Sequence, residues 1–480
     1  MNMSARFSQI SFVLFTSILV QDLYAQGNYR QENYGNRSIL LNGNVTGSVS
    51  DLGLTYYNPA RLAMVEDVAF TINAKTFELK QLELTNTFGD NEKIKSSDFN
   101  GLPSMVAGTF RIPNLEKDHF AYAFISKTRE KASLAYETGI IIDEIIPDYP
   151  GDETFLGRVV LDNSIKDEWI GGSWARDVSK KFSIGVSGFF SKYENKGVSE
   201  LNYNALHSED QVANYNKEIA FALDSYGLFW IVGAAYATDK IELGLNISLP
   251  YLELSTDGSF IYNEFLAGLG AGDDIFSYNN HTGLDAVRKT PLSIAIGAGI
   301  PIGKHKIHIN TEWHDGLSTY KPLILPSLES ELGTPPIFNF EEERKPVINY
   351  GLGIEYYINP KFSGYLSYSS DFSSYEKNAN IYDLLSREDK DINFKTDYQH
   401  FGFGVDVTFK TIQLILGATY STSNAEFEQP VDFPGSTFGA VPNEVSALKQ
   451  TRWQFVVGIE IPFLQKELDK RLKNIAKKKK

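Results

Sequence analysis

The feature that most constrains this chain is an alternation of apolar and polar residues with a period of two, repeated between Val65 and Phe463. In its clearest copy, every second residue is apolar: Trp453, Phe455, Val457, Ile459, Ile461 and Phe463. Segments 242–249, 351–358 and 401–409 repeat the pattern. Successive side chains of a strand point to opposite faces, so this period predicts β-strands with one apolar face each.

Alternation alone fits a water-soluble sandwich with its apolar face inside or a membrane barrel with that face outside. The spacing of the segments separates the two. Fourteen strands are predicted, at 65–85, 102–112, 118–141, 165–178, 181–205, 215–237, 240–256, 287–300, 304–316, 345–358, 361–375, 395–409, 411–424 and 447–463. Connections after even-numbered strands are short, and those after odd-numbered strands are long, as in Asp257–Ala286 and Leu317–Arg344. This order predicts an all-β fold, a fourteen-stranded antiparallel transmembrane β-barrel with short periplasmic turns and both chain ends in the periplasm.

Composition excludes several other classes of protein. Mean hydropathy is −0.23, and no stretch beyond the N-terminus has the roughly 20 consecutive apolar residues of a membrane helix. The 45 basic against 60 acidic residues give a net charge of −15, which argues against a nucleic-acid partner. There is no cysteine, so disulfides, thiolate nucleophiles and cysteine metal sites are excluded.

The two ends of the chain differ from the barrel region. Residues 1–25 contain a short apolar stretch and end in the small residue Ala25. This pattern indicates a secretory signal peptide rather than a buried N-terminal helix, because the polar residues that follow could not extend a helix into a core. Residues 464–480 carry eight basic and two acidic side chains. We interpret them as a solvated basic tail in the periplasm, with contact to anionic headgroups as the alternative.

Residues 26–64 precede the predicted barrel, 65–463, and have no strand-length alternation. Fourteen strands enclose more space than their own side chains fill, so we expect this segment to plug the lumen. The segment ends in Asn58-Pro59-Ala60, directly before the first strand. There the side chain of Asn58 is expected to bond to nearby backbone, and Pro59 fixes a tight turn. The alternative is that the turn only ends the plug and aims the first strand.

Asp51, Thr55, Tyr57 and above all Asn58-Pro59-Ala60 resemble the hatch motif of the FadL-type outer-membrane transporters. The segment Tyr226–Leu245 also resembles the middle hairpin of that family. The resemblance implies an N-terminal hatch inside a fourteen-stranded barrel and a kinked third strand. It further implies that a hydrophobic ligand is caught between external loops, moves to a pocket in the lumen, and leaves sideways through the wall when the hatch shifts.

Two further groups of residues are candidate sites. Lys127, Arg129 and Glu130 place charges within the third predicted strand, where lipid contact is costly. They mark either an inward bend with a gap in the wall or a loop tip, and the loop is the favoured interpretation. An apolar cluster in the predicted loop 257–286 would either capture ligand or fold as a small helix over the barrel mouth. It comprises Phe260, Tyr262, Phe265 and Leu266.

Three functional hypotheses follow. The first is passive uptake of hydrophobic compounds such as long-chain fatty acids, with outer-membrane lipid, lipopolysaccharide and the ligand as partners. The second is a FadL-like barrel that binds an envelope protein, as the accessory barrels of the type IX secretion system do. The third is an outer-membrane lipid enzyme, which is the weakest because the sequence has no catalytic constellation. The histidines have no metal-ligand spacing, and no cofactor is expected.

Overall fold

The computed structural model describes residues 28–64, 70–87, 93–112, 114–115, 117–145, 151–207, 211–269, 272–375, 396–409, 412–428 and 445–461. The predicted signal peptide, the predicted basic tail, residues 65–69 and Phe463 lie outside these ranges. Within them, no helix is long and apolar enough to cross a membrane.

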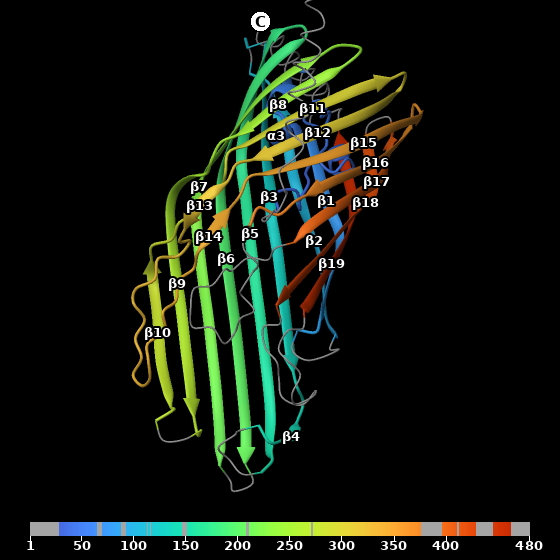
Figure 1. The fold of residues 1–480 in the computed structure, drawn as a ribbon. Coiled ribbons are helices and arrows are strands. Elements are labelled where there is room, and N and C mark those ends of the chain that lie inside the picture. The colour runs from blue at the N-terminus through green and yellow to red at the C-terminus, as the bar shows by residue number, and fades with distance from the viewer. Residues whose placement is uncertain are drawn as a thin grey trace, which may run out of the picture.

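The structure is built on an antiparallel sheet that closes on itself, because β1 pairs with β2 on one side and β19 on the other (Figure 1). Its strands are β1 (Phe70–Thr85), β2 (Lys93–Phe110), β3 (Asp118–Glu137), β4 (Ile141–Asp143), β5 (Glu153–Ser179), β6 (Phe182–His207), β7 (Val212–Ala237), β8 (Glu242–Ser248), β9 (Leu252–Ala267), β10 (Ile275–Leu284), β11 (Ser293–Ile302), β12 (His305–His314), β15 (Val347–Asn359), β16 (Phe362–Asp371), β17 (Asp397–Thr408), β18 (Gln413–Glu428) and β19 (Val445–Ile461). Because β3 and β4, β8 and β9, and β10 and β11 each share one position, the 17 strands occupy fourteen positions. The predicted fourteen-stranded barrel is confirmed.

Near the short connections, the outer face of the wall is apolar and the inner face is polar or small. Ile296, Phe403 and Phe455 are 61%, 44% and 47% exposed, whereas Ser187 and Asn310 are buried inside. β11 and β12 have 10 residues each, which is about the length that a tilted strand needs to cross a bilayer. This apolar outer band is the lipid-facing surface of the barrel.

Beyond the band, the part of the wall formed by β3, β4, β5, β6, β7, β9 and β10 extends farther than the other strands (Figure 1). β5, β6 and β7 have 27, 26 and 26 residues, so roughly 15 residues of each extend about 50 Å beyond the band. In this extension the two faces are reversed: Lys192 and Lys196 are exposed outside, and Leu201 and Ile219 are buried inside. The predicted strand 165–178 is shorter than β5 because β5 continues from lipid into water.

The inside of the extension is crossed by residues 317–344, which we name the strap. The strap begins with β13 (Leu317–Tyr320) and ends with β14 (Glu342–Arg344), and these two strands pair with each other. Between them, Phe338 and Phe340 pack against Phe260 of β9, with ring centroids 5.5 and 5.6 Å apart. The strap also pairs with β10 through Leu332 and Phe276. The extension therefore has an apolar core of its own.

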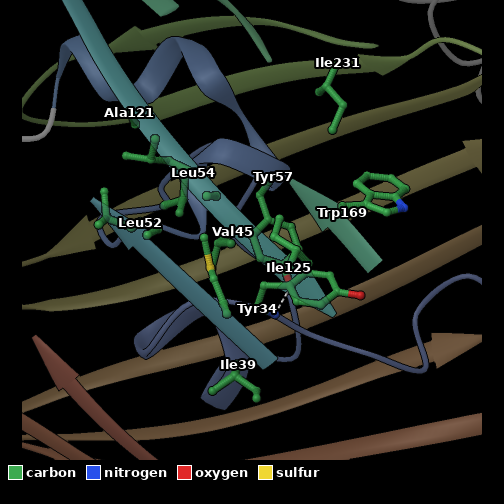
Figure 2. Packing of buried hydrophobic residues seen from close by; sticks show 14 of the residues in the cluster. Tyr34, Ile39, Val45, Leu52, Leu54, Tyr57, Ala121, Ile125, Trp169 and Ile231 are labelled. Atoms are coloured by element: carbon green, nitrogen blue, oxygen red, sulfur yellow. Dashed lines mark hydrogen bonds between the residues drawn. The ribbon is translucent and has the colours of Figure 1, made fainter. Parts of the chain in front are cut away.

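Residues 28–64, the N-terminal segment, lie inside the barrel and contain α2 (Arg37–Leu40), α3 (Leu54–Tyr57) and η1 (Pro59–Ala63). Tyr34 and Leu54 are fully buried and belong to a cluster with Ile125 of β3 and Trp169 of β5 (Figure 2). Inward-facing glycines make room for this segment, since a Cβ on Gly244 would lie 2.0 Å from the Thr46 carbonyl oxygen. The backbone of the N-terminal segment therefore packs directly against the inner face of the wall at these glycines.

Candidate functional site

Asn58 joins the N-terminal segment to the wall. Its Oδ1 accepts a hydrogen bond from the Ala60 amide at 3.2 Å, which caps η1 at Pro59. Its Nδ2 donates to the carbonyl oxygens of Thr46 at 2.9 Å and of Ala234 in β7 at 3.1 Å. One fully buried side chain therefore ends the turn and also holds it against the barrel.

Ion pairs connect the N-terminal segment to widely separated strands of the barrel. Distances of 2.9–3.1 Å separate Arg30 from Glu312, Arg37 from Glu460, Arg61 from Glu242, and Glu32 from Arg452. In buried pairs of this kind, removing one partner costs about 3–5 kcal/mol, because the other charge is left without compensation. The segment is therefore fastened to β8, β12 and β19 at the same time.

The charged run in the third strand lies within β3, so the favoured loop interpretation is wrong. The register between β3 and β5 shifts between Ser126 and Thr128, and the Nζ of Lys127 lies 5.1 Å from the ring centroid of Tyr56 inside the barrel. Tyr34 donates a hydrogen bond to the Lys127 carbonyl oxygen at 2.6 Å, and burial raises the pKa of Tyr34, which keeps this donor neutral. The bulge thus directs the Lys127 ammonium group into the barrel and toward aromatic rings, so that it does not contact lipid.

β2 and β3 pair only from Met105 and Ile125 to Phe110 and Phe120. Beyond this short ladder, β2 continues along β1, while β3 continues along β5. In the described part of the chain, the two strands do not pair again. We name this divergence the β2–β3 split.

A cavity of about 310 Å³ is bordered by the N-terminal segment and by the stretch of β3 that no longer pairs with β2. Its lining includes Gln31 and Tyr56 of the N-terminal segment, Lys127, Thr128, Glu130 and Ala132 of β3, Asp167 and Trp169 of β5, Phe229 of β7, and Arg288. Of the predicted gap residues, Lys127 and Glu130 therefore reach the cavity. Arg129 instead lies outside and forms a 2.6 Å ion pair with Glu168.

Arg288 is the main cavity residue that the sequence analysis did not identify. Its Nη2 lies 2.6 Å from Asp167 Oδ2, and its guanidinium lies 4.0 Å from the ring centroid of Tyr193 and 4.5 Å from that of Tyr251. Arg288 lies in the predicted strand 287–300, but β11 begins only at Ser293, so Arg288 belongs to an irregular segment that strand alternation does not describe. Around Arg288 the cavity thus presents aromatic rings beside a neutralised charge pair, while other charged side chains, among them Lys289, Glu342 and Arg344, also line it.

The predicted capture residues lie in a strand, so both the loop and the helix interpretation of 257–286 are wrong. Phe260 and Tyr262 are fully buried beneath the strap. Phe265 is an odd number of residues from Phe260, so it points to the opposite face of β9, and it is 40% exposed. Leu266 is half-buried. None of the four lines the 310 Å³ cavity. Strand alternation therefore divides this cluster between the two faces of β9.

Truncation at these positions is expected to have unequal effects. Phe260→Ala should weaken the packing of the strap against β9 by about 3 kcal/mol of free energy, because it leaves a void under Phe338 and Phe340. Phe265→Ala should change stability by less than about 0.5 kcal/mol, because its side chain is exposed. Limited proteolysis within residues 321–341 measures the difference. Equal cleavage of the two variants would contradict the packing described here.

No protein-family description and no curated protein sequence matches the chain. Among solved structures, it is similar to a Pseudomonas aeruginosa FadL homologue, with 11% identity, a TM-score of 0.55, and coverage of 91% of this chain and 100% of the other. It is also similar to the Pseudomonas putida toluene transporter TodX, with 12% identity, a TM-score of 0.52 and the same coverage. The chain is therefore a transmembrane β-barrel with the fold of the FadL-type outer-membrane channels.

Proposed function

We propose that this protein is an outer-membrane channel for the passive uptake of hydrophobic compounds, with long-chain fatty acids as the expected class. The observation that carries this proposal is the position of the 310 Å³ cavity. The cavity touches the N-terminal segment through Tyr56 and, through Ala132, the stretch of β3 that lies beyond its ladder with β2. For a ligand in this cavity, the N-terminal segment would block the way along the barrel axis, and the β2–β3 split would offer a way out through the wall.

In this proposal the N-terminal segment is the hatch, and the turn at Asn58-Pro59-Ala60 is its fixed point on the wall. The ligand enters from the extension, contacts the aromatic rings around Arg288, and passes sideways at the β2–β3 split. Movement is driven by the preference of apolar groups for apolar surroundings, so no energy source is needed. The described neighbours, a FadL homologue and a toluene transporter, support this class of cargo.

The variant Ala132→Trp tests the route, because Ala132 lines the cavity on β3. A large ring at this position should obstruct the split and slow uptake of a labelled fatty acid by roughly tenfold, since access to the exit limits the rate. Ala135→Trp is the matched control, because Ala135 lies on the same strand with its side chain exposed. Uptake into proteoliposomes is the measurement.

Equal uptake by Ala132→Trp and the unchanged protein would contradict passage through the split. In that case the alternative, a barrel that serves an envelope protein partner, would become the better hypothesis. A constant protein partner in purifications from native membranes would support it.

A further inference from the structure

Five basic side chains are exposed on the outer face of three neighbouring strands. They are Arg129 and Lys131 of β3, Lys166 of β5, and Lys192 and Lys196 of β6. The sheet register pairs Arg129 with Lys166, and it places Lys131 and Lys196 on either side of Ser164. Neighbouring strands lie about 4.8 Å apart, so these groups form one compact surface, which we name the basic patch.

Acidic side chains neutralise only part of the basic patch. Glu168 pairs with Arg129 at 2.6 Å, and Glu194 pairs with Lys192 at 2.7 Å. Asp224 of β7 faces Glu194 across the sheet, at the edge of the patch. In the described residues, no carboxylate lies within ion-pair distance of Lys131, Lys166 or Lys196. Glu194 faces Lys166 across the sheet and attracts both Lys166 and Lys196, but its one negative charge is shared with Lys192. A local excess of positive charge thus stands on a chain whose net charge is −15.

The basic patch lies directly above the lipid-facing band. Ile170 and Phe190, four residues from Lys166 and two from Lys192, are 60% and 41% exposed on the same outer face. Trp230 of β7, 42% exposed, belongs to the same band. The short connections lie at the opposite end of these strands, which is the periplasmic end of such a barrel. The patch therefore stands at the headgroup level of the external leaflet.

We propose that Lys131, Lys166 and Lys196 form a binding site for the phosphate groups of lipopolysaccharide. Ammonium groups near a membrane surface attract anionic headgroups, and a phosphorylated glycolipid presents such groups at this level. The apolar band below the patch would contact the acyl chains of the same molecule. The site lies outside the lumen and does not depend on the proposed transport function.

The test compares two triple variants with the same loss of charge. Lys131→Gln/Lys166→Gln/Lys196→Gln removes the unpaired cations of the patch. Lys180→Gln/Lys181→Gln/Lys240→Gln removes three exposed lysines at the short connections and is the control. Each delipidated protein is titrated in detergent with fluorescent lipopolysaccharide, with enzymatically dephosphorylated lipopolysaccharide, and with inorganic phosphate as a competitor. Heat-modifiable mobility on gels confirms that both variants are folded.

We expect the patch variant to bind lipopolysaccharide at least tenfold more weakly than the unchanged protein, and the control variant to bind it normally. Dephosphorylated lipopolysaccharide should bind the unchanged protein as weakly as the intact lipid binds the patch variant. Equal affinity of both variants, or undiminished binding of the dephosphorylated lipid, would overturn the proposal. If inorganic phosphate bound the unchanged protein at least as tightly as lipopolysaccharide does, the patch would be assigned to free phosphate instead. Uptake assays decide the transport proposal separately.

Discussion

Oxidation of a disulfide introduced as Leu41→Cys and Gly353→Cys is expected to abolish uptake, and a reductant is expected to restore it. A Cβ built on Gly353 of β15 lies 3.7 Å from the Cβ of Leu41 in the N-terminal segment, near the roughly 3.8 Å of a disulfide. The chain has no other cysteine. The bond would hold the proposed hatch against the wall, so uptake of a labelled fatty acid should fall by at least about tenfold.

The matched control keeps the same cysteine in β15. In His308→Cys/Gly353→Cys, the new Cβ of Gly353 lies 3.5 Å from that of His308, which faces it across the ladder between β12 and β15. This disulfide joins two wall strands and leaves the N-terminal segment untied. Because His308→Cys also removes the 2.7 Å hydrogen bond between the Ser48 hydroxyl and His308, the effect of oxidation is measured against the reduced form of the same variant. Unchanged uptake by oxidised Leu41→Cys/Gly353→Cys would show that transport does not require the N-terminal segment to move relative to β15. An equal loss of uptake in both oxidised double variants would mean that the disulfides distort the wall.

Asp51→Ala is expected to release the N-terminal segment while the barrel remains closed. The buried carboxylate of Asp51 accepts hydrogen bonds from the Ser38 amide at 2.8 Å, the Ser38 hydroxyl at 2.8 Å and the Gly53 amide at 2.9 Å. Alanine removes the acceptor of all three buried donors, at a total cost of roughly 4 kcal/mol. All three donors belong to the segment itself, so the penalty falls on its local fold.

Ion conductance in planar bilayers and protease cleavage within residues 28–64 should both rise in the Asp51→Ala protein. Asp51→Asn is the control, because its amide oxygen still accepts part of these hydrogen bonds, and an intermediate effect is expected. A conductance equal to that of the unchanged protein would mean that the wall contacts at Asn58 and Arg61 are sufficient to keep the lumen blocked.

The barrel could be predicted because a lipid-facing strand must expose an apolar side chain at every second position. The same rule failed in the extension, where water replaces lipid outside. There Phe260 and Tyr262 point inward to the strap, so two members of the apolar cluster predicted in a loop belong to a core instead. The bulge at Lys127 could not be predicted either, because the sequence does not show which aromatic rings lie opposite it.

Local alternation and connection length are sufficient to predict a fourteen-stranded wall with an apolar outer face. The sequence also located Asn58-Pro59-Ala60 as a fixed turn before the first strand. The place where the wall divides and the lining of the cavity became known only from the folded chain, because both depend on contacts between distant residues. Asp167 and Arg288 are far apart in the sequence, and the β2–β3 split depends on which neighbour each strand follows. Such long-range pairings leave no periodic trace in the order of residues.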